Sequence, residues 1–397
     1  MKAACIPMVA ACVFAAVCRA DVPSPGHAGK LPAASRQSLL DKEARPFVFA
    51  DPDWFQWGGS CILGEDGKYH LFYARWPRDN PRGMFGWLYV SEIARAVADK
   101  PEGPYVHQET VLKGFGEPQQ ERWDAHNAHN PCITRMKDPD TGKLRYYLYF
   151  IANRDDDETA SDWLDRVVTQ RVGVASADSP AGPWKRHDKP VIAPPAGPLR
   201  RYVTNPGVCQ LPDGRYLMVL KGRANEGSGE AARRGNFGPM LHGWALADRP
   251  EGPFVAQDSL LFPASVPAED PCVWVQGDWI FCAVKDWHGK LGGQTGISYV
   301  RGKLDADGKI DWQVPENASI TPREIRWDDG IVTKLDATER PFVLRDASGK
   351  PSHLFMAASE LNPFANGNQK PREDGKVVPL RNLPFNLCLP LVPKSVR

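Results

Sequence analysis

The sequence predicts an all-β fold, a five-bladed β-propeller. Three observations lead to this prediction. A short motif recurs five times along the chain, each copy of the motif opens a hairpin, and the 397 residues include 35 glycines and 37 prolines, as tight turns between many short strands require. A repeated unit that cannot bury both faces by itself is stabilised by stacking against its neighbours around an axis.

The repeated motif is a polar residue followed by proline and a short apolar run. Ser60 stands in the place of the proline in the first copy, so the copies are spaced by 65 to 75 residues. They read "WGGSCILGE" from residue 57, "AHNPCITRM" from 128, "VTNPGVCQL" from 203, "AEDPCVWVQ" from 268 and "TERPFVLRD" from 338. We therefore expect each copy to begin the innermost strand of one blade.

The residues that follow each copy predict the rest of the blade. A turn such as "GEDGK" or "LPDGR" leads into a second apolar run such as "YHLFYARW" or "YLMVLKG", which is typical of a β-hairpin. A corner motif follows in three copies, "AVADKPEGPY" from 96, "ASADSPAGPW" from 175 and "ALADRPEGPF" from 245. It indicates a third strand and a turn before an outermost fourth strand.

The ends of the chain and the blades define the expected domain organisation. Residues 1–20 have a basic start, an apolar stretch and small residues near the end, which is typical of a secretory signal peptide. Residues 21–46 are expected to form an N-terminal extension and residues 47–397 the propeller. Export to the periplasm or the medium is predicted, with a lipoprotein anchored at Cys18 as the alternative.

Charge and cysteine content exclude several classes of protein. The formal net charge of +1 favours neither nucleic acid nor a membrane surface as a partner, and no later stretch is apolar enough to span a bilayer. The cysteines form no CxxC pair, so we expect no zinc or redox site, and no cofactor is required. The repeat-equivalent cysteines Cys61, Cys132 and Cys272 are expected to pack in the core as free thiols, with disulfides as the alternative. The oligomeric state is left open.

Polar residues are expected to gather at one mouth of the central channel. The innermost strands all start at one face, and long connections such as Arg154–Gln170 and Arg223–Leu241 return to that face. Candidates for substrate binding are the residues at the strand starts and at the ends of the second strands, namely Trp57, Arg75, His129, Asn130, Asn205, Lys221, Lys285 and Arg340. Carboxylates at the same rim are suited to acid–base chemistry on a glycosidic bond.

The repeated hairpins with Asp or Asn before Pro, together with the corner motif, resemble the five-bladed propeller glycoside hydrolases. This group includes glycoside hydrolase family 43 and its fructan-acting and neoagaro-oligosaccharide-acting relatives. The resemblance extends from about Phe47 to the end of the chain. It implies an Asp at the start of the first blade as general base, a second Asp that tunes a pKa, a Glu as general acid, and inversion at the anomeric carbon.

The resemblance suggests Asp53, in "ADPD" at 50–53, as a catalytic residue. The repeat itself places the acids elsewhere, because blades two and three present His129-Asn130 and Thr204-Asn205. We therefore expect catalytic acids on blades four and five, at Glu269, Asp270 and Glu339. Of the adjacent pair on blade four, Asp270 is expected to face the axis. His129 or His126 is a candidate for sharing the proton transfer.

The sequence therefore favours an exported glycoside hydrolase that acts from the ends of plant or algal oligosaccharides. A cluster of Arg75, Lys221 and Lys285 suggests an anionic sugar such as a uronic acid. A non-catalytic carbohydrate-binding propeller and a propeller glycoside phosphorylase are the alternatives. No metal is assigned to the site, while a structural cation on the propeller axis stays open.

Overall fold

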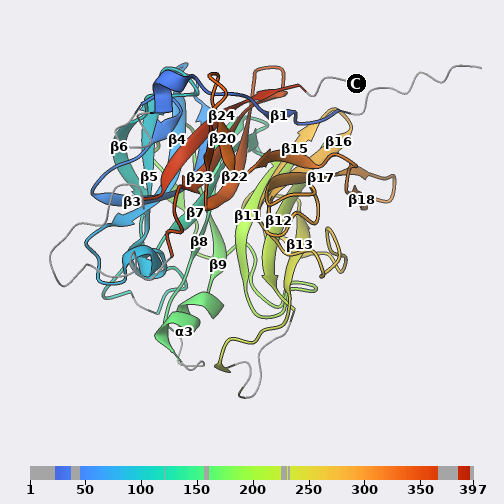
Figure 1. The fold of residues 1–397 in the computed structure, drawn as a ribbon. Coiled ribbons are helices and arrows are strands. Elements are labelled where there is room, and N and C mark those ends of the chain that lie inside the picture. Colours follow the sequence, from blue (N-terminus) through green and yellow to red (C-terminus); the bar gives the residue numbers. More distant parts are fainter. Residues whose placement is uncertain are drawn as a thin grey trace, which may run out of the picture.

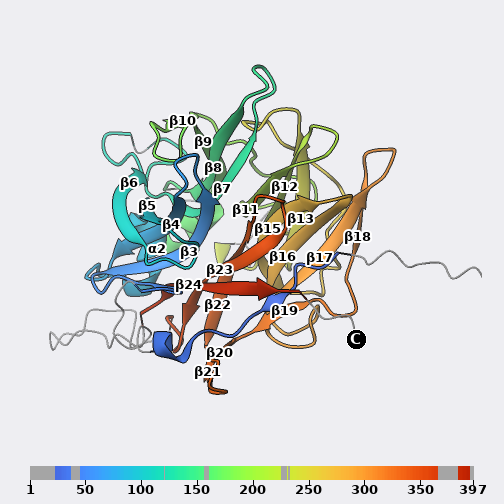
Figure 2. The same cartoon turned by 90° about the horizontal axis from the view of Figure 1, so that it is seen from above.

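The computed structural model describes residues 23–36, 45–119, 121–155, 161–224, 230, 233–364 and 383–393. Over these residues, five antiparallel sheets follow one another around a common centre (Figures 1 and 2). The predicted five-bladed β-propeller is confirmed. The predicted signal peptide lies outside the described residues.

The first four blades are consecutive along the chain. Blade one contains β3 (Trp54–Leu63), β4 (Tyr69–Pro77), β5 (Glu92–Ala98) and β6 (Val106–Leu112). Blade two contains β7 (His129–Lys137), β8 (Leu144–Ala152), β9 (Arg171–Ala177) and β10 (Lys185–Arg186). Blade three contains β11 (Val203–Gln210), β12 (Tyr216–Arg223), β13 (Met240–Ala247) and β14 (Val255–Ala256). Blade four contains β15 (Ala268–Gln276), β16 (Trp279–Asp286), β17 (Gly296–Leu304), β18 (Ile310–Gln313) and β19 (Ser319–Pro322).

Blade five joins the two ends of the described chain. It contains β22 (Ala337–Arg345), β23 (Pro351–Ser359) and β24 (Phe385–Val392), and β1 (His27–Ala28) and β2 (Val48–Phe49) both pair with β24. A separate hairpin, β20 (Glu324–Arg326) with β21 (Val332–Lys334), precedes this blade. Because β1 comes from the start of the chain and β24 from its end, their pairing closes the ring.

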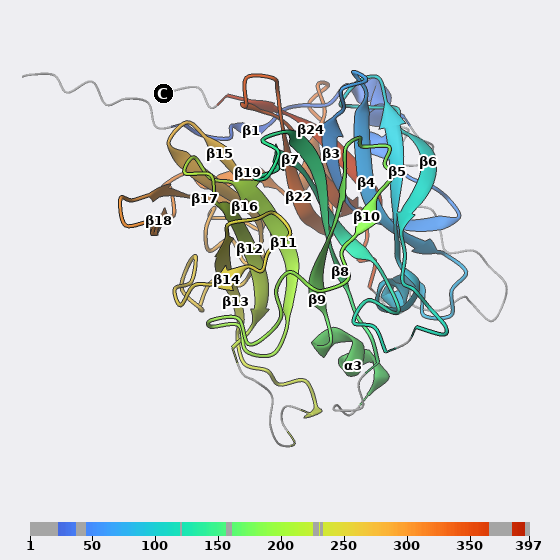
Figure 3. The ribbon, with the colours of Figure 1, turned by 180° about the vertical axis from the view of Figure 1, so that it is seen from behind.

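The hydrophobic core lies between neighbouring blades. Phe72 of blade one packs with Ile133 and Leu148 of blade two. Blades two and three, which lie side by side in Figure 3, share another cluster that includes Tyr149 and Met218. Similar clusters join blades three and four, four and five, and five and one. Each blade therefore buries both of its faces against neighbours, as expected for the repeat.

The six cysteines of the described residues are all buried and carry free thiols, in agreement with a packing role. They are Cys61, Cys132, Cys209, Cys272, Cys282 and Cys388. Burial raises the pKa of the Cys272 thiol to about 12, which keeps the thiol protonated and unreactive.

A β-bulge interrupts each innermost strand at the repeated motif. The register shifts between Trp57 and Ser60 in blade one, and between Glu269 and Cys272 in blade four. The expected alignment of blade one was therefore wrong by one residue. Gly59, not Ser60, occupies the proline position, and Ser60, not Cys61, corresponds to Cys132 and Cys272. Without a proline in this copy, the sequence could not fix the alignment.

The helices lie in connections that follow the second strand of a blade. They are η2 (Gly83–Gly86) and α2 (Trp87–Val90) after β4, and α3 (Asp162–Val168) after β8, at the bottom of Figure 1. A short turn of helix, η1 (Ala33–Arg36), precedes the propeller. Among the described residues, no helix has the length and apolar character needed to cross a membrane.

Candidate active site

A cavity of about 660 Å³ opens at the face of the propeller where the innermost strands begin. Its floor and lower walls come from the starts of the innermost strands and the ends of the second strands. Its upper walls come from the connections that follow the second strands, which include α2 and α3. This is the face on which the sequence predicted a binding site.

The floor of the cavity is a ring of five residues at the bulges, with one residue from each blade. All five have a positive φ between 51° and 61°: Gly58, Asn130, Asn205, Asp270 and Arg340. Glycine, asparagine and aspartate adopt this left-handed conformation more readily than other residues. The polar residue before each proline therefore has a backbone role in addition to any chemical one.

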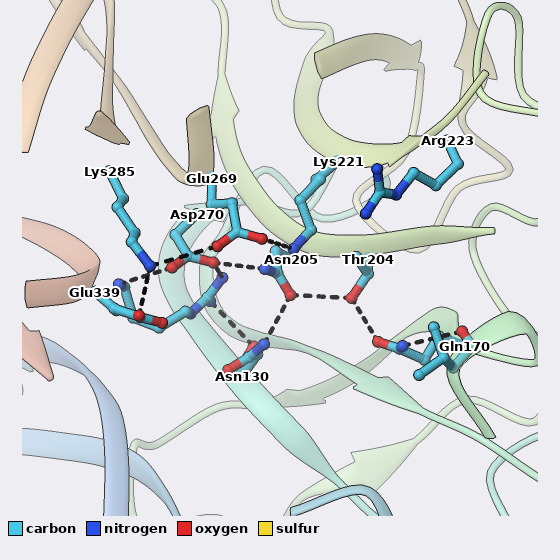
Figure 4. Close-up of polar contacts among 12 residues, drawn as sticks. Asn130, Gln170, Thr204, Asn205, Lys221, Arg223, Glu269, Asp270, Lys285 and Glu339 are labelled. Atoms are coloured by element: carbon cyan, nitrogen blue, oxygen red, sulfur yellow. Dashed lines mark hydrogen bonds and ion pairs between the residues drawn. The ribbon is translucent and has the colours of Figure 1, made fainter. Parts of the chain in front are cut away.

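Hydrogen bonds link the ring from blade to blade (Figure 4). Asn130 Nδ2 donates to Asn205 Oδ1 at 2.7 Å, and Asn205 Nδ2 donates to Asp270 Oδ1 at 2.5 Å. The Arg340 backbone N–H donates to Asp270 Oδ2 at 3.0 Å, and its guanidinium lies 3.4 Å from both Asp270 Oδ1 and the Asn130 carbonyl oxygen. The buried negative charge of Asp270 thus has a cation and an amide as partners.

Gly58 completes the ring without a side chain because Arg340 occupies the space. A Cβ atom built at Gly58 would lie 3.0 Å from Arg340 Cγ and 3.1 Å from Arg340 Cβ. The arginine side chain therefore crosses the axis next to blade one and closes the bottom of the cavity.

Four charged residues of blades three, four and five form the layer above the floor (Figure 4). Lys221 Nζ donates to Glu269 Oε1 at 2.5 Å. Lys285 Nζ pairs with Glu339 and also lies 3.6 Å from Glu269 Oε2. The cross-strand register explains this arrangement, because Lys285 is directly opposite Glu269 on β16 and the next blade supplies Glu339.

The two glutamates have different proton affinities. Burial would raise the pKa of Glu269, but the Lys221 and Lys285 ammonium groups outweigh it and hold this pKa at about 2. Burial raises the pKa of Glu339, Lys285 opposes this effect, and the charges of Asp270 and Glu269 add to it. Glu269 is therefore an ionised carboxylate, and Glu339 is the carboxyl group that retains its proton to higher pH.

Blades one, two and three present neutral residues in the same layer, namely Trp57, His129 and Thr204. His129 is buried, its ring stacks on Trp87 with a centroid distance of 4.8 Å, and its Nδ1 lies 2.8 Å from Ser91 Oγ. Burial, with a smaller effect of Arg340, lowers the pKa of His129 well below its ordinary value. His129 is thus a neutral wall residue, which does not favour the expected part in proton transfer.

Aromatic side chains line much of the cavity. They belong to blade one, to the connections after β4 and β8, and to the segment after β23: Trp57, Trp76, Phe85, Trp87, Trp163 and Phe364. Pyranose and furanose rings expose C–H faces, and an apolar wall with a few polar groups is typical of a small-molecule site. Trp287 is also a lining residue, and its ring centroid lies 3.4 Å from Lys285 Nζ.

Two of the residues predicted for the site lie outside this cavity. Asp53 is an exposed turn residue ahead of β3, and its backbone N–H donates to Asp51 Oδ1 at 2.9 Å. Arg75 lies opposite Gln56 on the neighbouring strand, whereas Ala74 lies opposite Trp57. The Arg75 side chain forms an ion pair with Glu92 at 2.7 Å. Side chains alternate along a strand, so this one-residue offset directs Arg75 away from Lys221 and Lys285.

The other predicted residues come together at the cavity: Trp57, His129, Asn130, Asn205, Lys221, Glu269, Asp270, Lys285, Glu339 and Arg340. Both Glu269 and Asp270 line the cavity, whereas only Asp270 was expected to face the axis. Strict alternation does not hold at a β-bulge, so two successive side chains line the cavity. Glu339 is paired with Lys285 of the preceding blade.

Several residues of the cavity were not assigned to it from the sequence. Trp163, Phe85, Trp87 and Phe364 lie in connections, where neither periodicity nor the repeat marks a position. The length of the connection after β8 is the one sequence signal for these residues, and it indicates the binding face without indicating individual positions.

The three acids of the site form a tight cluster. One carboxylate oxygen from each of Glu269, Asp270 and Glu339 lies within 4.8 Å of the other two. Such a group of oxygens can hold a metal ion. Here, however, Lys221, Lys285 and Arg340 already direct N–H donors at these carboxylates.

No protein-family model and no curated protein sequence matches the chain. Solved structures do share its fold. A family 117 glycoside hydrolase from the marine bacterium Zobellia galactanivorans aligns over 85% of both chains with a TM-score of 0.54 and 17% identity. An α-L-arabinofuranosidase from Lactobacillus brevis aligns over 90% of this chain and 95% of its own, with a TM-score of 0.54 and 13% identity.

A family 43 β-xylosidase/α-arabinofuranosidase from a compost microbial metagenome also has this fold. It covers 89% of this chain and 94% of its own, with a TM-score of 0.53 and 15% identity. At these identities the likeness concerns the fold.

Proposed function

We propose that this chain is a glycoside hydrolase whose reaction centre is the pair Glu269 and Glu339. The observation that supports this most is the opposite displacement of two glutamate pKa values within one cavity. Glycosidic cleavage needs one protonated and one ionised carboxyl group beside the scissile bond. The fold shared with structures described as glycosidases agrees with the proposal.

In this proposal Glu339 is the general acid and donates its proton to the leaving glycosidic oxygen. Glu269 carries the negative charge that assists bond formation at the anomeric carbon or stabilises the positive charge that develops there. Lys285 holds both carboxyl groups in place. Asp270, below them, is a positioning residue whose charge helps Glu339 to keep its proton.

Action at chain ends is the second part of the proposal. The ring of axial residues closes the bottom of the cavity, so a glycan could enter only from the open face. A blind cavity admits the end of a chain more readily than its middle. Export, predicted from residues 1–20, would expose the protein to plant or algal oligosaccharides, and stays a prediction.

The anionic sugar and the phosphorylase alternative have less support than the sequence suggested. Both relied on Arg75, Lys221 and Lys285 as available cations. Arg75 is bound to Glu92, and the two lysines are bound to the site glutamates. We therefore propose a neutral sugar as the substrate and water, rather than phosphate, as the acceptor of the glycosyl group. It also includes no axial cation, because the Arg340 side chain occupies the axis and supplies the positive charge beside Asp270.

The test is turnover of a panel of 4-nitrophenyl glycosides and of xylo-, arabino- and agaro-oligosaccharides. We expect Glu269→Gln and Glu339→Gln each to reduce kcat/KM by about 10²- to 10⁴-fold, the usual contribution of an acid or base. Glu324→Gln is the matched control, because Glu324 is a largely buried glutamate paired with Arg326 and Lys334 outside this cavity.

A non-catalytic carbohydrate-binding propeller is the second candidate. It is favoured by the neutral residues that blades one to three present beside the cavity. Binding of an oligosaccharide by the wild-type protein, with no turnover of any member of the panel, would contradict the proposed hydrolase and support this candidate.

A further inference from the structure

A row of four aromatic side chains leads from the mouth of the cavity to the level of the glutamates. Trp163 packs edge-on against Phe85 with a centroid distance of 6.4 Å. Phe85 contacts Phe364 at 5.4 Å, and Phe364 contacts Trp57 at 6.1 Å. We call these four residues the aromatic row.

The exposure of the aromatic row changes from its outer to its inner end. Trp163 is 40% exposed, whereas Trp57 is 5% exposed. Phe85 and Phe364, between them, are half-buried. Trp57 belongs to the same layer of the propeller as Glu269 and Glu339, since all three precede the bulge residue of their strand. The row therefore joins the solvent-exposed rim to the proposed reaction centre.

The outer end of the row is held in place by charged contacts. Asp162, next to Trp163 in α3, accepts from Arg82 Nη2 and from Arg166 Nε, each at 3.0 Å. Both guanidinium groups also lie over the Tyr89 ring of α2, at 3.7 Å and 4.4 Å. These contacts fix α3 against α2, so Trp163 presents its indole ring on an anchored element.

Core packing does not account for Trp163, because this tryptophan is 40% exposed at the rim of the cavity. Large aromatic rings that are pre-positioned on an anchored element are efficient contact surfaces, because little conformational entropy is lost on binding. The C–H face of a sugar ring is an apolar surface of matching size, and the aromatic row is continuous with the cavity proposed to hold a glycan.

We propose that Trp163 and Phe85 form an outer sugar-binding subsite, which makes the preferred ligand a neutral oligosaccharide rather than a disaccharide. This inference rests on the proposed function for the identity of the ligand as a carbohydrate. It adds a binding site at the rim and a preference for chain length.

The experiment measures binding separately from turnover. Linear xylo-, arabino- and agaro-oligosaccharides of two to six units are titrated calorimetrically into the Glu339→Gln variant, with and without Trp163→Ala. We expect Trp163→Ala to weaken the binding of a tetrasaccharide roughly ten-fold more than that of the disaccharide of the same series. Trp163→Phe should restore most of the difference, because it keeps an aromatic ring.

Trp279→Ala is the matched control, since Trp279 is a half-buried tryptophan that is outside the lining of this cavity. It should leave the binding of short and long ligands unchanged, and thermal unfolding verifies that each variant is folded. Equal losses for all chain lengths in Trp163→Ala, or no binding by any member of the panel, would overturn the subsite. Length-dependent binding without turnover by the wild type would overturn the hydrolase proposal alone.

Discussion

The ammonium group of Lys285 pairs with the carboxyl group of Glu339, 54 residues further along the chain and in the next blade. The same ammonium lies 3.6 Å from Glu269. Lys285 is only 3% exposed, so the charge that bridges the two glutamates is shielded from solvent. This bridge makes the proton affinities of the two glutamates depend on one another.

Activity should be lost as the pH rises through the pKa of Glu339. The proposed acid must be protonated, and burial together with Asp270 and Glu269 raises its pKa above the usual value. On the acidic side, Glu269 keeps its charge down to a pKa of about 2. A kcat/KM profile against pH measures this. A basic limb at or below the ordinary glutamate value would contradict the assignment of Glu339 as the acid.

Replacing Lys285 by methionine should move both limbs of that profile to higher pH. Lys285 lowers the pKa of Glu269 and of Glu339, so removing its charge raises both values. The matched control is Lys68→Met, which removes an exposed lysine paired with Asp99 on a hairpin turn outside the cavity. A profile of Lys285→Met that coincides with the wild type would exclude this role.

Lys221→Met should reduce stability. Lys221 and Glu269 form an ion pair in which each side chain is about 15% exposed, and Glu269 would lose one of its two cations. Breaking one partner of a buried pair costs about 3 to 5 kcal/mol, and the remaining lysine should limit the loss to about 2 kcal/mol.

Chemical denaturation at neutral pH measures the effect of this change. The double variant Lys221→Met with Glu269→Gln should recover part of the loss, because it removes the uncompensated charge. The electrostatic explanation would be contradicted if Glu269→Gln lowered the stability of Lys221→Met by as much as it lowers the stability of the wild type.

The product of hydrolysis should retain the anomeric configuration of the substrate. One carboxylate oxygen of Glu269 lies within 4.8 Å of one carboxylate oxygen of Glu339. Retaining glycosidases have carboxyl groups about 5 to 5.5 Å apart, whereas inverting enzymes need about 6.5 to 9.5 Å to admit water. This differs from the inversion that the sequence resemblance implies. Proton NMR of the first product decides between them, and an inverted product would refute this prediction.

Gly58→Ala should destabilise the fold more than Gly67→Ala does. Both glycines have a positive φ, of 59° and 75°, so both substitutions introduce backbone strain of about 1 to 2 kcal/mol. Only at Gly58 would the new methyl group press on Arg340, at 3.0 Å, whereas a Cβ at Gly67 has no atom within 4 Å. Equal losses in thermal or chemical unfolding would show that Arg340 does not fill the axis next to Gly58.

The repeat explains why much of the candidate site could be located from the sequence. Equivalent positions in a propeller return to one ring around the axis, so the residues before each proline could be placed together without any contact information. Asp53 and Arg75 were misplaced for different reasons. Asp53 came from a motif outside the repeat, whereas Arg75 lies near the end of β4 one residue beyond Ala74, which is the position that corresponds to Lys221 and Lys285.

The sequence by itself determined the number of blades, the face that carries the cavity and the residue types at its floor. Local patterns encode these features, because turns, proline and alternating apolar residues act within a single hairpin. Only the tertiary structure decided which charges are partners and which aromatic residues form the wall. Lys285 meets Glu339, and Trp163 meets Phe85, across different blades and connections, so their contacts depend on how the ring closes rather than on any spacing along the chain.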